Sequence, residues 1–312
     1  MVSKIALEEH FLFPDFIEYW SPTVVDLPTQ RRDKALSRLT DFGEMRLTAM
    51  NEAGIAVLAL AGPGAQAERD TATAMRRART DKRPDCYSGF GHLAMQDARA
   101  AADELERCIR ELRFCGVMIN GHTNGQYLDN PALYPFWERA EALGALIYLH
   151  PVDPVTPAPV LEGHKGLRRA TWEWTFETGS HALRLIFSGL FDRFLRARRP
   201  WPPWRDASVS AVALRQPRGP RLLRHQAWQA AVTLFQGEFS CDHVGHVLGR
   251  AAQSTIAALG HERVMFAADY PFESAQEAGV FLDEVALAEP VRWAIVAENA
   301  IKHLGLAQLA PA

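Results

Sequence analysis

The chain has 312 residues, of which 48% are hydrophobic and 23% are charged, and its formal net charge is −3. This balance is typical of a globular protein with a sizeable core, and it gives no reason to expect nucleic acid or an anionic membrane as a partner. No apolar run approaches the roughly 20 residues needed to span a bilayer, and the N-terminus lacks the apolar core of a signal peptide. The four cysteines form no CxxC pair, so we expect reduced thiols and a cytoplasmic location.

Short apolar runs alternate with helical patterns along the chain. Runs typical of buried strands lie at Lys4–Leu7, Ile55–Leu60, Tyr87–Met95, Cys115–Ile119, Ala145–Leu149 and Arg263–Ala267. Helices are predicted at 101–114, 135–144, 171–191, 274–287 and 291–304. Buried parallel strands read as continuous apolar runs, and strands that alternate with helices indicate βαβ units. The sequence therefore predicts an α/β fold with a parallel sheet.

Polar residues follow several of these predicted strands. Glu8 and His10 follow the first strand, Asn120 the fourth, His150 the fifth and Asp269 the last. In barrels of this class, function lies at the C-terminal ends of the strands. Glu8 and His10 are two residues apart in an extended segment, so their side chains should leave it on the same side. Two carboxylates and two imidazoles predict a site for a divalent ion, Zn²⁺ or Mn²⁺, and the carboxylates favour the harder ion.

Each of these residues also has a simpler interpretation. Glu8 could be a solvated charge, His150 before proline could pack in a core or a turn, and Asp269 could cap a helix. Their occurrence at the same end of their strands favours the metal site, because independent surface residues need not share that position. His92 does not clearly share it, and His181 lies within a predicted helix, from which it could point at the barrel mouth.

Four motifs then carry a family resemblance. In chain order they are KIALEEHF, YLHP, ETGSHALRLIFSGLFDRF and VMFAADYPFE. Together they resemble the metal-dependent aromatic acid decarboxylases of the amidohydrolase superfamily, which include γ-resorcylate, 2,3-dihydroxybenzoate and 5-carboxyvanillate decarboxylases and, more distantly, aminocarboxymuconate semialdehyde decarboxylase. The resemblance covers residues 1–194 and 254–307. It implies a (β/α)8 TIM barrel of the amidohydrolase type, a single domain over residues 1–312, and a homodimer or homotetramer.

The resemblance also implies a site and a reaction. Glu8, His10, His150 and Asp269 would hold one divalent ion, Mn²⁺ or Zn²⁺. An ortho-hydroxylated aromatic carboxylate would chelate it, Asp269 would protonate the ring carbon that bears the carboxylate, and loss of CO₂ would restore the aromatic ring. This predicts a non-oxidative decarboxylase. The alternatives are a metal-dependent hydrolase on the same scaffold and a catalytically impaired pseudoenzyme.

A planar, acidic aromatic substrate would need an aromatic pocket. Asn120, Phe11 and Tyr270 are predicted to contact the substrate, and Phe13 and Trp174 are further candidates for the pocket wall. Each of the aromatic residues is equally well explained by core packing, since large aromatic side chains also dominate protein interiors.

One stretch departs from the family pattern. Residues 198–225, RRPWPPWRDASVSAVALRQPRGPRLLRH, contain seven arginines, no lysine and one acidic residue. The family motifs expected between Phe194 and Ser254, one like LGHMGE and one like TTSG, are absent. A basic nucleic-acid arm would interrupt the barrel, and a disordered insertion would leave the absent motifs elsewhere in the chain. A frameshift is the third interpretation.

The frameshift interpretation can be tested with the genetic code. Trp201–Arg218 can be encoded so that the shifted frame reads GHHGETLPFLLWRFDSR, and Ser240–His246 likewise permits HVTTSG. Both strings match the absent motifs in the expected order. We therefore expect residues 195–253, the anomalous segment, to form no regular βαβ unit, because about fifty residues lack the patterning of strands 6 and 7.

Overall fold

Eight parallel strands form the centre of this computed structural model, which describes residues 4–12, 14, 17, 21, 28–61, 87–194, 201–204, 231–236, 252–253, 255–257 and 260–306. The strands are β1 Lys4–His10, β2 Ile55–Ala61, β3 Tyr87–His92, β4 Gly116–Asn120, β5 Ile147–His150, β6 Trp201–Trp204, β7 Ala231–Gln236 and β8 Val264–Ala267. Their hydrogen-bonded order is β5-β4-β3-β2-β1-β8-β7-β6, and each pair is parallel. Because β5 and β6 also approach each other, the strands form the ring of a (β/α)8 barrel.

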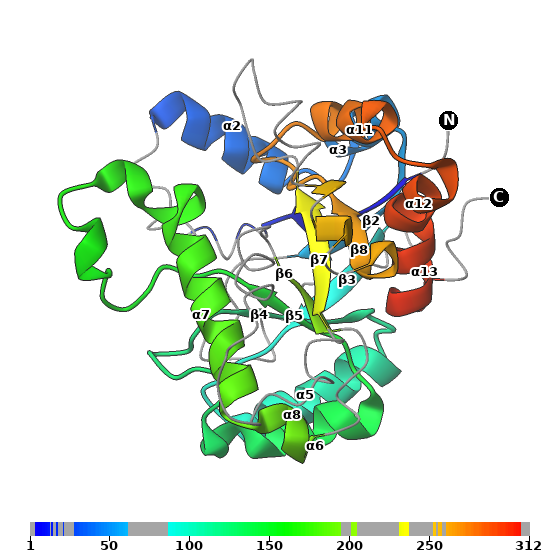
Figure 1. Cartoon of the computed structure of the whole chain (residues 1–312). Helices are drawn as coiled ribbons and strands as arrows, with labels where there is room; N and C mark the ends of the chain where they lie inside the picture. The colour runs from blue at the N-terminus through cyan, green and yellow to red at the C-terminus, as the bar shows by residue number, and fades with distance from the viewer. Residues whose placement is uncertain are drawn as a thin grey trace.

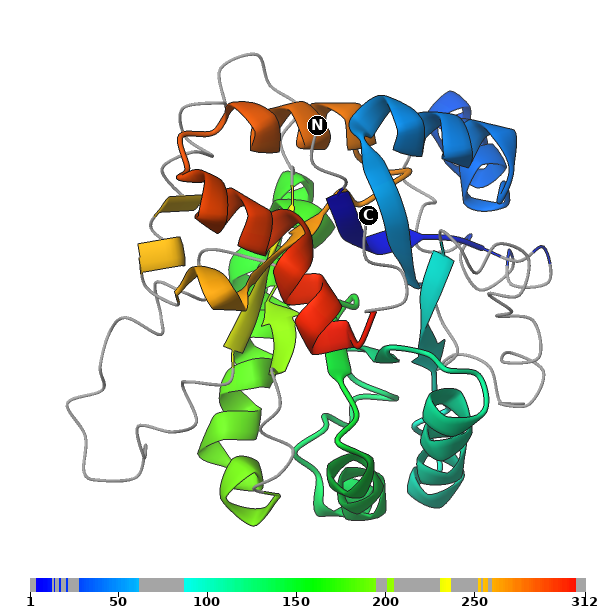
Figure 2. The ribbon, with the colours of Figure 1, turned by 90° about the vertical axis from the view of Figure 1, so that its right-hand side faces the viewer.

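Helices surround this ring (Figure 1). They are α2 Thr29–Leu39, α3 Glu44–Ala53, α5 Ala98–Arg110, α6 Tyr134–Leu143, α7 Glu173–Phe187, α8 Leu190–Arg193, α11 Ala275–Glu284, α12 Glu289–Trp293 and α13 Asn299–Leu304. Figure 1 shows α5, α6 and α8 below the strands and α3 and α11 above them, and Figure 2 shows α11 to α13 from the side. Of the helices that the structure describes, none combines the length and the apolar character that crossing a bilayer requires.

Local sequence signals explain where these helices begin and end. The Asp97 side chain caps α5 by accepting hydrogen bonds from the backbone N–H groups of Arg99 and Ala100. The buried residues of α5 include Ala101, Leu105 and Cys108, which recur with the period of one helical face. Helices α3 and α6 each end at a glycine in the left-handed conformation.

Two groups of buried apolar side chains support the barrel. One gathers around β1 and β8 and includes Ile5, Phe266, Leu282 and Ile295, so it joins the first strand to the C-terminal helices. Helix α11 lies close to the end of α3 on this side. A Cβ atom at Gly279 would stand only 2.6 Å from the Ala53 carbonyl oxygen, so glycine permits this approach.

The second group lies around β4 and β5. It includes Leu105 of α5, Trp137 of α6, Ile119 of β4 and Leu185 of α7. Burying a large apolar side chain contributes about 1.5–3 kcal/mol. The two groups together hold β1, β4, β5 and β8 in place, and these are the strands whose ends carry the predicted site.

The anomalous segment supplies two strands of the ring, so the expected loss of strands 6 and 7 is not confirmed. β6 and β7 pair in parallel with each other, and β7 pairs with β8. The reason is that ladder hydrogen bonds join backbone groups, so an extended segment can occupy a strand position whatever its side-chain pattern. Pro202 and Pro203 lack a backbone N–H, and the pairing of β6 shifts register between Trp201 and Pro203. Residues 195–200, 205–230 and 237–251 lie outside the described residues.

Candidate metal centre

Four of the predicted site residues meet at the C-terminal ends of three strands. The ligand atoms of Glu8 and His10 on β1 and of His150 at the end of β5 all lie within 4.8 Å of one another. His150 Nε2 is 3.4 Å from Glu8 Oε1. Asp269, two residues after β8, adds a carboxylate whose Oδ1 is 2.9 Å from His10 Nε2. Glu8, His10 and Asp269 are buried, so the group lies within the barrel rather than on its surface.

Neighbouring groups orient this constellation of Glu8, His10, His150 and Asp269. His150 Nδ1 lies 2.8 Å from the Pro151 carbonyl oxygen, and a carbonyl can only accept, so Nδ1 carries the proton. In the neutral imidazole, Nε2 on the side of Glu8 then carries the lone pair. The Tyr148 hydroxyl donates a hydrogen bond to Glu8 Oε2. This is how metal-binding side chains are usually held, with one atom anchored and the other turned to the site.

The backbone of β1 is irregular at the site, so the regular strand alternation expected for Glu8 and His10 does not hold there. Glu8 has a φ of 62°, in the left-handed region, and the pairing of β1 with β2 shifts register between Ala6 and Glu9. Glu8 and His10 therefore do not share a face by simple strand alternation. They meet because a bulge turns the strand locally, as bulges near active sites often do. Asp269 also has a positive φ, 57°.

The residues predicted to contact substrate have different surroundings. Asn120 is the register partner of His150, so it stands beside the constellation. Phe11 is buried, and its ring packs edge-on against Phe42 at 5.5 Å. Tyr270 is buried beneath the guanidinium of Arg46, 4.8 Å from its ring centroid. Phe11 and Tyr270 therefore have packing partners of their own, and their role as substrate contacts stays a prediction.

The two further aromatic candidates are Phe13 and Trp174. Phe13 lies outside the described residues. Trp174 is in α7, and its indole N–H donates to Asp153 Oδ1 at 2.6 Å. That hydrogen bond ties α7 to the loop after β5, so Trp174 has a structural partner of its own.

Two aromatic side chains near the constellation were not predicted. Phe272 is 42% exposed, and its ring meets the His10 ring edge-on with centroids 5.4 Å apart. His92 ends β3 and is buried; burial and then the charge of His10 lower the pKa of His92 to about 3, so its imidazole is neutral. The signal for His92 was its place at a strand end, and the signal for Phe272 was its closeness to Asp269 in the chain.

Two buried charged residues support the backbone behind the constellation. Glu9, between Glu8 and His10, accepts a hydrogen bond on Oε1 from the Ala268 N–H at 3.0 Å. Arg46 of α3 donates from Nη2 to the His10 carbonyl oxygen at 2.7 Å. Burial raises the pKa of Glu9 to about 8, and it lowers the pKa of Arg46.

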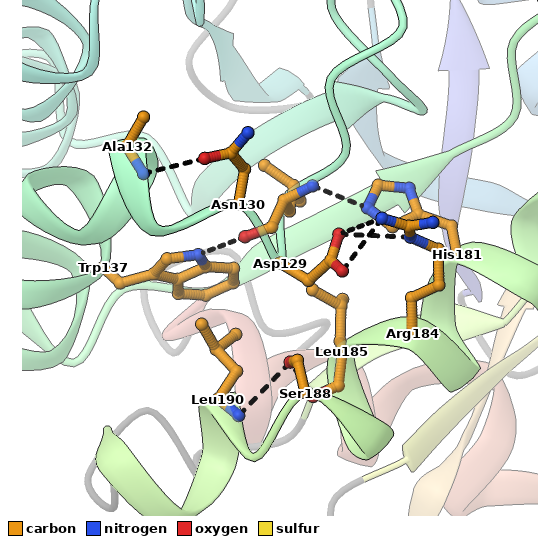
Figure 3. A network of polar contacts seen from close by, with 10 residues as sticks. Asp129, Asn130, Ala132, Trp137, His181, Arg184, Leu185, Ser188 and Leu190 are labelled. Atoms are coloured by element: carbon orange, nitrogen blue, oxygen red, sulfur yellow. Dashed lines mark hydrogen bonds and ion pairs between the residues drawn. The ribbon is translucent and has the colours of Figure 1, made fainter.

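A polar network between α7 and the loop after β4 fixes the neighbouring wall (Figure 3). His181 Nε2 accepts from the Leu128 N–H at 3.1 Å, and the Leu128 carbonyl accepts from Trp137 Nε1 at 2.9 Å. Arg184 pairs with Asp129 at 3.0 Å. His181 is fully buried, and its Nε2 anchors the loop that follows Asn120.

The donor set fits a divalent ion. Two imidazole nitrogens and two carboxylates are borderline-to-hard ligands of the kind that Mn²⁺ and Zn²⁺ accept. The ligand atoms of Glu8, His10 and His150 lie close enough to one another to share one ion, and Asp269 Oδ1 lies beside His10 Nε2. Such a cluster of buried carboxylates is costly unless a cation or protons compensate it.

The chain is similar to several known proteins. The profile of the family described as Amidohydrolase matches residues 46–306. The γ-resorcylate decarboxylase of Rhodococcus jostii (strain RHA1) is 34% identical over 330 aligned positions, which cover 96% of this chain and 98% of that protein. Among solved structures, a 2,6-dihydroxybenzoate decarboxylase complexed with 2,6-dihydroxybenzoate has a TM-score of 0.84 at 29% identity, covering 98% of this chain and 100% of the other. A dihydroxybenzoic acid decarboxylase from Polaromonas sp. JS666, with bound manganese and the inhibitor 2-nitroresorcinol, has a TM-score of 0.83 at 29% identity and covers 98% of each chain.

The barrel, the mixed histidine and carboxylate site and the family profile define the class: the chain belongs to the amidohydrolase family. Within that family it falls among the metal-dependent aromatic acid decarboxylases, as its four motifs predicted.

Proposed function

We propose that this chain catalyses the non-oxidative decarboxylation of an ortho-hydroxylated aromatic carboxylic acid. The observation that carries the proposal is the convergence of Glu8, His10, His150 and Asp269 at the ends of β1, β5 and β8. These four side chains are the proposed ligands of one divalent ion. The bound manganese of the Polaromonas relative supports Mn²⁺ as the first ion to test, with Zn²⁺ as the alternative.

The chain's own residues would perform the proton transfer. An ion at this site would hold the carboxylate and ortho-hydroxyl oxygens of the substrate and polarise them. Asp269, which is buried beside His10, is the proposed donor of the proton to the ring carbon that bears the carboxylate. Cleavage of the bond to the carboxylate then returns its electron pair to the ring, so the overall reaction consumes one proton and releases one CO₂. Asn120, beside His150, is the proposed polar contact to the substrate.

The test is a panel of hydroxybenzoic acids incubated with the chain and added Mn²⁺, with CO₂ release as the readout. Asp269→Asn should lower turnover by about 10²–10⁴-fold, the usual worth of a general acid. Asp192→Asn on α8 is the matched control, because Asp192 is exposed and lies on a helix away from the strand ends. Turnover by Asp269→Asn equal to that of the control would contradict the proposed role of Asp269.

Two alternatives predict different results. A metal-dependent hydrolase on the same scaffold would release no CO₂ from the panel and would instead hydrolyse a lactone or an amide. A catalytically impaired chain would turn over neither class. Unfolding without cooperativity and failure to bind Mn²⁺ in a stoichiometric amount would identify that case.

We also infer that the anomalous segment is encoded out of frame. Two recovered strings support this, and β6 begins at Trp201, the residue at which the first of them begins. Resequencing the locus is decisive, since a shifted frame that lacks the two motifs refutes the inference. Activity of the chain should be compared with that of a frame-restored version, whose strand-6 histidine the family's motif would supply.

The remaining expectations concern the whole protein. We propose a single barrel domain over residues 1–312 that assembles as a homodimer or homotetramer in the cytoplasm. Light scattering of the purified chain tests the assembly, and fractionation of the source cells tests the location.

A further inference from the structure

Glu9 has an unusual position among the site residues. It lies between the proposed ligands Glu8 and His10 on β1, and it is 0% exposed. Its Oε1 accepts a hydrogen bond from the N–H of Ala268 at 3.0 Å. Ala268 follows β8 and directly precedes Asp269, another proposed ligand. One buried side chain of β1 therefore holds the backbone at the residue before a ligand.

Arg46 approaches the same two strands from α3, and it is also 0% exposed. Its Nη2 donates to the His10 carbonyl oxygen at 2.7 Å, and its Nε donates to the Asp41 carbonyl oxygen at 2.9 Å. Its guanidinium also lies over the ring of Tyr270, the residue after Asp269. The Tyr270 carbonyl in turn accepts from the His10 N–H at 2.8 Å. Arg46 thus contacts the backbone of one proposed ligand and the side chain that follows another.

The backbone in this region needs such support. Glu8 and Asp269 have φ values of 62° and 57°, in the left-handed region that is unfavourable for residues other than glycine. Strained positions of this kind persist only where surrounding contacts determine them. Burying Glu9 and Arg46 is also unfavourable, because ionisable groups lose their hydration in a protein interior unless other contacts compensate them. These two residues supply polar contacts close to both strained positions. Arg46 donates to the carbonyl oxygen of His10, two residues after Glu8, and Glu9 accepts from the N–H of Ala268, directly before Asp269.

We propose that Glu9 and Arg46 are positioning residues that fix the backbone of β1 and β8 and so set the geometry of the four-ligand metal centre. The proposal rests on the proposed metal site. Neither residue contacts the ion or the substrate in this role, and both act through His10 and Asp269. Loss of a hydrogen-bonded partner behind a metal site typically weakens metal binding about 10–100-fold.

The test compares variants of the full chain by Mn²⁺ titration. Glu9→Ala removes the acceptor for the Ala268 N–H, and we expect its Kd for Mn²⁺ to rise about 10–100-fold. Glu9→Gln keeps an oxygen acceptor at the same place, so its Kd should lie between those of Glu9→Ala and the unsubstituted chain. Free Mn²⁺ is counted by electron paramagnetic resonance, and the spectrum of the bound ion reports distortion of its ligands. Thermal unfolding of the metal-free variants gives their stability separately.

Lys4→Met is the matched control. Lys4 is on the same strand and 1% exposed, but it pairs with Asp283 of α11 at 2.9 Å, at the opposite end of β1 from the site. Its substitution should lower the thermal stability while leaving the Kd for Mn²⁺ and the spectrum of the bound ion unchanged. A purely structural role for Glu9 would give that same pattern in Glu9→Ala.

The outcomes separate the two proposals. If the unsubstituted chain binds no Mn²⁺, the metal site fails and the positioning role fails with it. If the unsubstituted chain binds and folded Glu9→Ala binds equally well with an unchanged spectrum, only the positioning role is overturned. If Glu9→Ala does not fold, Arg46→Lys tests the positioning role instead. Lysine keeps the charge but cannot donate to the His10 and Asp41 carbonyl oxygens at once. We expect at least about tenfold weaker binding from it, and unchanged binding overturns the proposal.

Discussion

The surroundings of Glu177 predict how the free energy of unfolding should depend on pH. It lies on α7 and is 4% exposed. Its Oε1 would stand 3.1 Å from a Cβ atom placed at Gly121, so the carboxyl group is pressed against the turn that follows Asn120. Burial raises the pKa of Glu177 from 4.5 to about 7, although interactions with the Tyr127 hydroxyl and the Val152 backbone lower it. The substitution to test is Glu177→Gln, which keeps the shape and removes the titration.

The sign of the effect follows from linkage. A carboxyl group with a raised pKa in the folded state binds its proton more tightly there than in the unfolded chain. The stability it contributes is therefore fully present below the unfolded pKa of 4.5 and is lost as the pH rises through about 7. A difference of about 2.5 pKa units, from 4.5 to about 7, corresponds to about 3 kcal/mol in the free energy of unfolding.

The assay is urea unfolding followed by circular dichroism at several values between pH 5 and pH 8. The unsubstituted chain should lose about 2–3 kcal/mol more stability across this range than Glu177→Gln. Glu284→Gln on α11 is the control, because Glu284 is exposed, and its profile should follow that of the unsubstituted chain. Parallel profiles for Glu177→Gln and the unsubstituted chain would refute the reasoning, because they would mean that Glu177 titrates alike in both states.

Three further predictions concern the metal centre and the packing of the barrel. His150→Ala should weaken Mn²⁺ binding at least about 100-fold, more than the loss of an outer partner, whereas His164→Ala, exposed after β5, should not change it in the same titration. Chelation by EDTA should lower the free energy of unfolding by about 2.7 kcal/mol if the ion is present at 100 times its Kd, and an unchanged melting temperature would contradict a bound ion. Gly279→Ala should cost about 1–3 kcal/mol in chemical unfolding, because its Cβ would stand 2.6 Å from the Ala53 carbonyl oxygen. Gly166→Ala is the control for that comparison, since nothing lies within 4 Å of its added Cβ.

Much of the fold was predictable because buried parallel strands leave a strong signal. The runs at Ile55–Leu60 and Cys115–Ile119 became β2 and β4 with ends shifted by only a residue or so. Helix α2 was not predicted, because Leu39 is its one buried residue and its other apolar residues, Ala35 and Leu36, are outnumbered by polar and charged ones. The helix predicted at 171–191 is broken after Phe187, where Gly189 takes a φ of 74° and α8 begins.

The residues of the site were predictable only in part. Glu8, His10, His150 and Asp269 could be found because parallel strands bring their C-terminal ends to one rim, a rule that needs no tertiary detail. The role of Arg46 could not be found in this way. It depends on where α3 packs against β1, and nothing in the sequence around Arg46 indicates which carbonyl its guanidinium reaches.

The bulge at Glu8 was also hidden from the sequence. Strand patterns report which residues are apolar, and KIALEEH reads as an ordinary strand that ends in charged residues. The positive φ of Glu8 arises from the pairing of β1 with β2 and from contacts with β8. Such features require the assembled ring, because they depend on segments far apart in the chain.

The neighbouring positions of β1 and β8 in the ring have a consequence for synthesis of the protein. The first strand leaves the ribosome early, but its partner β8 is synthesised last. Leu7 pairs with Ala267 of that strand, and His10 lies beside Asp269, which follows it. Until the last strand emerges, the apolar residues of β1 lack the β8 side chains that pack with them in the finished fold. Exposed apolar surface of this kind favours aggregation, and the proposed ion site lacks Asp269 until translation is nearly complete. Shielding of the unfinished chain, by chaperones for example, would then matter most for this first strand.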